Sequence, residues 1–430
     1  MEFIENQYLD EIRSTIRARK VPWEGYVRAE LLNAEQASLF KTLEKYPVAE
    51  WVKPVSENLQ QYVSTTMALL SPPSRDDVVR YIALFVGDVI TTIPEFTTEL
   101  LADSRCWPAL TALLTKPDEQ ITILTTRVLA VLANSQIAPV DVIAELVAFL
   151  GDKFLTSPNT NLQDIAVQEL ALLAQTKFYR PVIWEKRSVI LPQIIQLAQS
   201  PQFGLQVQYY SLLLIWLISY DRTIAKGCIS EYNSAQTLLE TAKISVKEKI
   251  VRVSVATLAN YVRFSPHSAI PAIISQRGLQ IVNLLSERKW ADDELRQDVE
   301  TLKQQLTDAY NSMTTFDEYY AELKTKRLLW SPTHRSATFW KTYIEEFRSQ
   351  DWAVLKQLVQ LLQTSEEPVT QAVACNDIAC IVNTAPQSVT VLNKLGAKIK
   401  IMELMNSADP EVRYEALKAT QALIGHMFAS

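Results

Sequence analysis

A pattern that recurs about every forty residues constrains this chain more than any other feature. Segments with helical periodicity end in a similar triplet, in which leucine is followed by alanine or isoleucine and then by a polar residue. Four such triplets follow one another at steps of 41, 44 and 41 residues, beginning at Leu132, Leu173, Leu217 and Leu258. The register returns at Ile381, 123 residues or three times 41 after Leu258, and again at Leu423. Since one such unit cannot bury its apolar face alone, neighbouring units must stack.

The length of the period indicates the kind of repeat. Armadillo and HEAT repeats recur every 40 to 47 residues or so, and each contributes two or three helices. The composition agrees, because the chain has 8 glycines in 430 residues, where average usage predicts roughly 30. We therefore predict an all-α fold, an armadillo/HEAT-like right-handed superhelical solenoid in two domains.

The scarcity of glycine also excludes several kinds of active site. The closest pair of glycines is Gly204 and Gly227, which lie 23 positions apart. No segment can therefore form the glycine-rich turns of dinucleotide-binding or Walker-type nucleotide sites, or the nucleophile elbow of a hydrolase. We expect a protein that is not an enzyme.

Charge, hydropathy and cysteine content narrow the setting of the protein. The net charge of −6 argues against nucleic acid as a partner, since phosphate recognition needs a clustered basic excess. The longest apolar run, residues 209–220, is about 12 residues long, against roughly 20 for a bilayer span. The opening MEFIENQYLD has no pattern of a secretory signal. Four cysteines are too few for a disulfide framework and favour a reducing cytosol.

Histidine and cysteine give no sign of a metal or catalytic site. The three histidines, His267, His334 and His426, lie far apart and outside any metal-binding spacing. Cys375 and Cys380 have no histidine nearby, and we interpret them as small buried residues. We interpret His334 as a loop residue that makes an ordinary hydrogen bond. No cofactor or metal is expected.

Three asparagines share a position in the repeat, namely Asn134, Asn260 and Asn383. They could line a ladder of amides that binds a peptide backbone. We favour helix-terminal capping instead, because asparagine is common at helix ends. None of the nine tryptophans is followed four residues later by asparagine, so a groove of the nuclear-import type has no support.

The regular pattern breaks after about residue 264 and returns near residue 363. Between these points, residues 292–312 predict a charged helix whose apolar positions are Leu295, Leu302 and Leu306. The polar run that follows, residues 311–315, interrupts the pattern. We therefore predict two domains, an N-terminal armadillo/HEAT-like solenoid domain over residues 1–310 and a C-terminal helical-repeat domain over residues 311–430.

A cluster of aromatic residues begins the predicted second domain. Thr315 and Glu318 have the spacing of a capping box, and the helix that follows places Phe316, Tyr319 and Leu323 on one stripe. Trp330 and Trp340 flank a proline loop that could fold back over this stripe. We interpret the cluster as the core of the second domain. On the alternative interpretation, the charged neighbours form a partner surface, and these are Asp317, Glu318, Lys324, Lys326 and Arg327.

Several blocks of sequence in the same order resemble the H subunit of the eukaryotic vacuolar-type proton-pumping ATPase. The most specific are Phe316–Tyr319, Glu322–Lys324, Arg327–His334 and Phe339–Trp340. Other blocks that agree are Arg17–Val21 with Trp23 and Tyr26, Phe203–Tyr209, Ser245–Lys249 with Arg252, and Val412–Leu417 after Asp409. A generic armadillo protein would share the period but not these blocks.

The resemblance implies a non-catalytic, regulatory part of the pump's cytosolic sector. Such a component couples ATP hydrolysis to proton transport in the assembled pump and silences hydrolysis when the catalytic sector detaches. The implied partners are the peripheral stalk, catalytic head, central rotor and cytosolic part of the membrane sector. The implied location is the cytosolic face of vacuolar and other endomembranes, or the cytoplasm when detached, with membrane association only through the complex.

The sequence also offers further partner-binding residues and an alternative function. Among the candidates for partner binding we include Thr364, Glu366 and Glu367 of the connection Thr364–Pro368, which is compact where relatives can carry longer loops. A cytosolic armadillo-type adaptor or scaffold with other protein clients is the alternative function.

Overall fold

The computed structural model describes residues 6–72 and 74–425. All regular elements in these ranges are helices, which confirms the all-α expectation. The chain divides into two compact units, Met1–Pro266 and His267–Ser430, called here the N-terminal unit and the C-terminal unit. This division falls before the charged helix, whereas the domain boundary near residue 311 remains a prediction.

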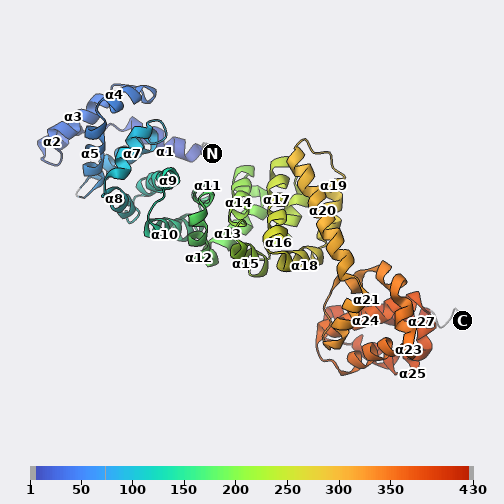
Figure 1. The fold of residues 1–430 in the computed structure, drawn as a ribbon. Helices are drawn as coiled ribbons and strands as arrows, with labels where there is room; N and C mark the ends of the chain where they lie inside the picture. The colour runs from blue at the N-terminus through green and yellow to red at the C-terminus, as the bar shows by residue number, and fades with distance from the viewer. Residues whose placement is uncertain (1–5, 73, 426–430) are drawn as a thin grey trace. The chain divides into compact units, whose positions relative to one another are not determined.

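Four long helices form the repeating part of the N-terminal unit. They are α9 (Glu119–Ser135), α11 (Thr160–Gln175), α14 (Leu205–Ile218) and α17 (Glu248–Phe264). Each packs against the next, and Figure 1 shows them following one another along the unit. The repeated triplets lie at or near their C-terminal ends, so the period in the sequence is the period of these stacked helices.

Shorter helices complete the N-terminal unit. Those before the repeat are α1 (Gln7–Ala18), α2 (Trp23–Arg28), α3 (Ala34–Leu43), η1 (Val48–Glu50), α4 (Val52–Glu57), α5 (Leu59–Leu70), α6 (Asp76–Val89), α7 (Pro94–Ala102) and α8 (Cys106–Leu113). Those between the long helices are α10 (Val140–Phe149), η2 (Leu150–Leu155), η3 (Lys177–Tyr179), α12 (Arg180–Glu185), α13 (Arg187–Gln199), η4 (Pro201–Phe203), α15 (Arg222–Ser230) and α16 (Ser234–Ile244).

The stacking explains why the long helices are apolar on more than one face. Helix α11 lies between α9 and α14, and Ile165, Leu170 and Ala174 are all buried in it. Burying one leucine or isoleucine side chain contributes about 1.5 to 3 kcal/mol. A helix with neighbours on both sides therefore gains far more from packing than from its intrinsic propensity.

A local turn precedes the last of the four long helices. Helix α17 begins at Glu248 after the N-cap Lys247. The Ser245 hydroxyl accepts a hydrogen bond from the Lys247 N–H at 3.1 Å. This local turn satisfies a backbone donor one step before the helix starts.

The three equivalent asparagines do not share one role. Asn134 and Asn383 are exposed near the ends of their helices. Asn260 lies inside α17, is 8% exposed and donates its amide to the Ser219 hydroxyl at 2.9 Å. It therefore ties α17 to the end of α14, and helix capping is the wrong interpretation for it.

The C-terminal unit holds the remaining helices. They are α18 (Pro266–Ser275), α19 (Gly278–Ser286), α20 (Asp293–Met313), α21 (Phe316–Lys324), α22 (Pro332–Arg335), α23 (Ala337–Thr364), α24 (Pro368–Thr384), α25 (Ser388–Lys394), α26 (Ala397–Leu404) and α27 (Pro410–Gly425). Helix α20 is the predicted charged helix, begun by Asp292, and it packs on α19. Helix α24 packs between α23 and α27.

Helix α23 consists of two halves joined by a kink. Gln350, Asp351 and Trp352 have φ of 51°, 54° and 63°, which is left-handed backbone. The kink separates two apolar stripes, one through Phe339 and Phe347 and the other through Leu355. All three of these side chains are buried, so each half of the helix contributes to the core.

Other expectations concern membrane spans and thiols. No helix within the described ranges is both long and apolar enough to cross a membrane. Cys375 is buried and Cys380 is half-buried, and burial raises the pKa of both thiols to about 12. His426 lies outside the described residues.

Candidate interaction surface

The aromatic cluster after Thr315 is attached to the core of the C-terminal unit. Thr315 is the N-cap of α21 and accepts a hydrogen bond from the Glu318 N–H at 3.4 Å. Tyr319 and Leu323 are buried, while Phe316 is half-buried against the same core. The Tyr319 ring lies 5.6 Å from the Trp340 ring and 5.1 Å from the Phe347 ring, measured between centroids. Helix α21 is thus anchored to α23.

The two tryptophans that flank the proline loop differ in burial. Trp340 is 2% exposed, whereas Trp330 is half-buried and packs on the edge of the core. The Arg335 guanidinium lies over the Trp330 ring, 4.9 Å from its centroid. The proline loop itself folds into the short helix α22, which lies between the two tryptophans in the chain.

His334 occupies the centre of a buried polar network, which corrects its interpretation as an ordinary loop histidine. Its Nδ1 lies 2.8 Å from Asp377 Oδ2 and its Nε2 lies 3.2 Å from Glu322 Oε2. The Tyr319 hydroxyl donates to Asp377 at 3.2 Å, and the Asn376 amide donates to the His334 carbonyl at 2.9 Å. The network connects α21, α22 and α24 below the surface.

Two carboxylates determine the charge of this histidine. Burial opposes the charged ring, but Asp377 and Glu322 outweigh it and raise the pKa of His334 to about 9. Burial likewise opposes the charged form of Glu322, and hydrogen bonds from His334, the Leu329 N–H and Ser331 nevertheless lower its pKa. The network therefore holds a charged imidazolium between carboxylates at neutral pH.

The predicted charged candidates all lie outside this core. Asp317, Glu318, Lys324, Lys326 and Arg327 are exposed. The ammonium of Lys324 lies over the Tyr320 ring, 4.2 Å from its centroid. Asp317 and Glu318 are in the first turn of α21, whereas the three cations are at its end. The acidic and basic candidates are therefore separated by the length of the helix.

The structure brings the basic end of α21 to the predicted connection after α23. Arg327 Nη2 lies 2.9 Å from Glu367 Oε1, although the two residues are 40 positions apart. Thr364 and Glu366 are exposed on the same connection. The Leu328 N–H donates to the Thr370 hydroxyl at 3.2 Å, which fixes the segment after Arg327 against the start of α24. We call Lys324, Lys326, Arg327, Glu366 and Glu367 the charged ledge.

Glu322, Asn376 and Asp377 were not predicted as site residues. They form the buried network beneath the segments that carry the charged ledge. A signal was present for Asp377, because it and Asn376 interrupt a stretch of α24 whose other residues are apolar or small. A charged residue on a buried helix face needs a partner. A buried cation near Asp377 was therefore predictable, although its identity as His334 was not.

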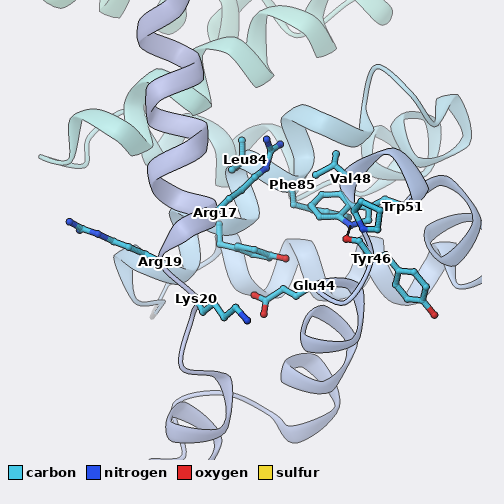
Figure 2. Close-up of a pocket in the computed structure, with 11 residues that line it drawn as sticks. Arg17, Arg19, Lys20, Glu44, Tyr46, Val48, Trp51, Leu84 and Phe85 are labelled. Carbon is cyan, nitrogen blue, oxygen red and sulfur yellow. Dashed lines mark hydrogen bonds between the residues drawn. The ribbon is translucent and has the colours of Figure 1, made fainter.

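A hollow of about 170 Å³ in the N-terminal unit is the other candidate (Figure 2). Trp51, Leu84 and Phe85 form its apolar wall, and Arg17 and Glu44 lie at its rim. Arg17 Nη2 lies 2.6 Å from Asp88, and the indole N–H of Trp23 donates to Glu44 at 2.9 Å. Figure 2 shows Arg19 pointing away from the hollow. Arg17 and Glu44 are therefore engaged within the chain, and the charged ledge is the stronger candidate site.

The fold and the ledge together define a class of protein. The chain is an armadillo-type helical-repeat protein that carries a charged surface on a rigid core. In the described part of the chain, no group of three or more histidine, cysteine, aspartate or glutamate side chains could hold a metal ion.

Comparison with protein families gives the particular family. The two family models of the V-ATPase H subunit match this chain, one over residues 7–306 and the other over residues 312–428. Together they span nearly all of the 430 residues. The chain belongs to the V-ATPase H subunit family.

Individual relatives agree along the same length. The V-type proton ATPase H subunit of Drosophila melanogaster is 27% identical and covers 97% of this chain and 90% of the relative. A probable V-type proton ATPase H subunit of Oryza sativa is 26% identical and covers 96% of each. Among solved structures, a designed armadillo repeat protein is 16% identical over 58% of this chain and 99% of its own, with a TM-score of 0.47.

Proposed function

We propose that this chain is a non-catalytic regulatory subunit of the vacuolar proton-pumping ATPase. It couples ATP hydrolysis to proton transport in the assembled pump and silences hydrolysis in the detached cytosolic sector. Family membership over nearly the whole chain supports this proposal. The absence of glycine-rich phosphate loops agrees with a role that involves no hydrolysis by this chain.

The proposal assigns separate partners to the two predicted domains. Residues 1–310 bind the peripheral stalk, and residues 311–430 reach the catalytic head, the central rotor or the cytosolic part of the membrane sector. The protein works at the cytosolic face of vacuolar and other endomembranes and reaches the membrane only through the complex. It needs no cofactor and no nucleic acid.

The charged ledge is the observation that supports the regulatory role in this proposal. Its side chains come from two segments that the sequence separates by about forty residues, and an ion pair between Arg327 and Glu367 joins them. The buried network around His334 and the Leu328 to Thr370 hydrogen bond fix the backbone on which they sit. Exposed charge on a fixed backbone suits recognition, because little ordering is needed when a partner binds.

A charge reversal tests the role of the ledge. We expect the Lys326→Glu/Arg327→Glu variant to keep its melting temperature nearly unchanged, since an exposed ion pair contributes about 0 to 1 kcal/mol. In pumps reconstituted with this variant, silencing or coupling should weaken. The matched control is Lys341→Glu/Lys394→Glu, which makes the same change in net charge at exposed residues of the same unit and should leave activity unchanged.

A swap of the pair separates surface charge from internal stability. The Arg327→Glu/Glu367→Arg variant reverses both charges but can rebuild the ion pair. Normal stability with impaired pump regulation supports the ledge as a partner surface. Normal regulation in both ledge variants contradicts it, and the partner surface then lies elsewhere.

A further inference from the structure

Exposed apolar side chains recur at one position of the repeat in the N-terminal unit. Ile137, Phe178, Tyr220 and Phe264 follow one another at steps of 41, 42 and 44 residues. Ile137 is 63% exposed, Phe178 57% and Tyr220 39%, while Phe264 is half-buried. Each lies at the C-terminal end of one of the stacked helices α9, α11, α14 and α17 or directly after it. We call these four residues the apolar rim.

Contacts between successive repeats bring the segments that carry the rim close to one another. The Tyr179 hydroxyl accepts a hydrogen bond from the Ala138 N–H at 2.7 Å, which joins the segment beside Ile137 to the segment beside Phe178. The Arg180 guanidinium lies 5.5 Å from the centroid of the Tyr220 ring. The Tyr220 and Phe264 rings are 6.0 Å apart. The four side chains therefore follow one edge of the stack.

Cations accompany the aromatic members of the rim. The Lys177 ammonium lies 5.0 Å from the centroid of the Phe178 ring, and the Arg263 guanidinium lies 5.3 Å from that of Phe264. A third cation, the half-buried Arg180, lies over the Tyr220 ring, and Asp221 is the anion that acts on it. Asp221 is used within the chain, where it caps α15 by accepting from the Thr223 and Ile224 N–H groups. The edge thus combines apolar surface with an excess of positive charge.

The backbone along this edge favours a helix as the occupant over an extended strand. Residues at the four helix ends already donate their N–H groups within the chain, namely Gln136 to Leu132, Thr176 to Leu173, Ser219 to Ile215 and Ser265 to Tyr261. A strand needs backbone partners, whereas a helix satisfies its own backbone.

The spacing of the rim also suits a helix. Packed helices lie about 8 to 10 Å apart, and seven residues of an α-helix rise about 10.5 Å. Apolar residues repeated every seven positions of a partner helix could therefore meet side chains from successive helices of the stack. An apolar residue one turn further along, about 5.4 Å, could meet the closer pair, because the Tyr220 and Phe264 rings are 6.0 Å apart.

We propose that the apolar rim binds an amphipathic α-helix of another protein, whose apolar stripe repeats every seven residues and is flanked by acidic residues. The apolar stripe covers the rim, and the acidic residues face Lys177, Arg180 and Arg263. The proposal deepens the proposed function, in which residues 1–310 bind another protein, because it names a surface and the kind of partner that this surface fits. Its test uses no pump activity, so the two proposals can fail separately.

A direct binding measurement tests the proposal on the full chain. The probe is a fluorescein-labelled peptide of about 20 residues, which would span about 30 Å as a helix, with leucines in a heptad stripe and glutamates beside them. We expect its fluorescence anisotropy to rise on binding and the affinity to fall as salt increases. A peptide with lysine in place of every glutamate should bind at least about tenfold more weakly.

Variants of the chain locate the binding. Phe178→Ser/Tyr220→Ser should weaken binding of the acidic peptide at least about tenfold, because the rim loses its largest apolar surfaces. The matched control is Ile244→Ser/Val246→Ser, since these side chains are 75% and 91% exposed between α16 and α17. The control should stay within about twofold of the unmodified chain. Lys177→Gln/Arg263→Gln should weaken binding and reduce its salt dependence.

Three results would overturn the proposal. One is an acidic peptide that does not bind the unmodified chain, and another is a basic peptide that binds as tightly. The third is equal weakening in the rim pair and the control pair. Melting temperatures of all variants guard against misfolding, and they should agree because every altered side chain is exposed or half-buried.

Discussion

His334 and Asp377 place opposite charges in the core of the C-terminal unit, joined at 2.8 Å. Both side chains are fully buried, so removing one partner leaves the other charge without compensation. Their effect is to attach helix α22 and the segment before it to α24. At the scale of single residues, this pair therefore fixes the segment next to the charged ledge against α24.

The pair predicts a loss of stability at alkaline pH. The pKa of His334 rises from 6.5 to about 9 on folding, so its contribution is fully present below pH 6.5 and is lost as the pH rises through 9. The shift corresponds to about 3 kcal/mol of unfolding free energy. Urea unfolding at several pH values between 6 and 10 measures it.

The control for this prediction is His334→Gln, which cannot titrate. It should be less stable than the unmodified chain at neutral pH and should lack the decline between pH 6.5 and 9. If the two proteins lose stability in parallel across that range, then another group titrates and the assignment to His334 is wrong.

Sequence reasoning succeeded for residues whose role is local and failed where the role depends on distant contacts. Thr315 is predictable as an N-cap because its partner is three residues away. His334 finds Asp377 43 positions away, and no spacing rule connects them. The same contrast explains Asn260, whose partner Ser219 is 41 positions away.

At the scale of elements, Gly278 shows how closely helices α18 and α19 are joined. It is the first residue of α19 and follows Arg277, which has a φ of 59°. A Cβ atom at Gly278 would lie 2.6 Å from the carbonyl oxygen of Ile273 and 2.3 Å from its side chain. A backbone atom cannot move away as a flexible side chain can.

Gly278→Ala should therefore destabilise the C-terminal unit by about 1 to 3 kcal/mol. Gly425→Ala is the matched control, because a Cβ atom there meets nothing within 4 Å. Thermal unfolding followed by circular dichroism should show a lower melting temperature for the first variant and no decrease for the second. Equal melting temperatures would mean that the turn between α18 and α19 relaxes easily.

The order of the elements was more predictable than their ends. The forty-residue period predicted the stacked helices, because their apolar faces must repeat whenever the packing repeats. The start of α17 at Glu248 was not predictable from the period alone, since Ser245 forms a local turn just before it. The kink in α23 was not predicted. Gln350 and Trp352 do not favour left-handed backbone, and Asp351, which adopts it more readily, is a weak signal alone.

At the scale of the whole molecule, the position of the domain boundary remains to be tested. The compact units divide after Pro266, whereas the polar run after α20 predicts a boundary near residue 311. If the predicted boundary is right, a fragment of residues 311–430 should unfold cooperatively and melt close to a fragment of residues 267–430. A fragment 311–430 without a cooperative transition would place α18 to α20 with the C-terminal domain.

The partner assignment of the two domains is tested by the same kind of fragment. Residues 1–310 should retain binding to the peripheral stalk of the pump, and residues 311–430 should not bind it. Pull-down with purified stalk proteins measures this, after circular dichroism has shown that each fragment is helical. The reverse distribution would contradict the assignment.

Reconstitution tests the central claim most directly. Pump prepared without its own H subunit should be combined with this chain, and ATP hydrolysis and proton transport should be measured together. The account predicts that the chain joins the assembled pump and raises proton transport per ATP hydrolysed, and that it lowers hydrolysis by the detached cytosolic sector. A chain that joins neither assembly and changes neither rate would contradict the account.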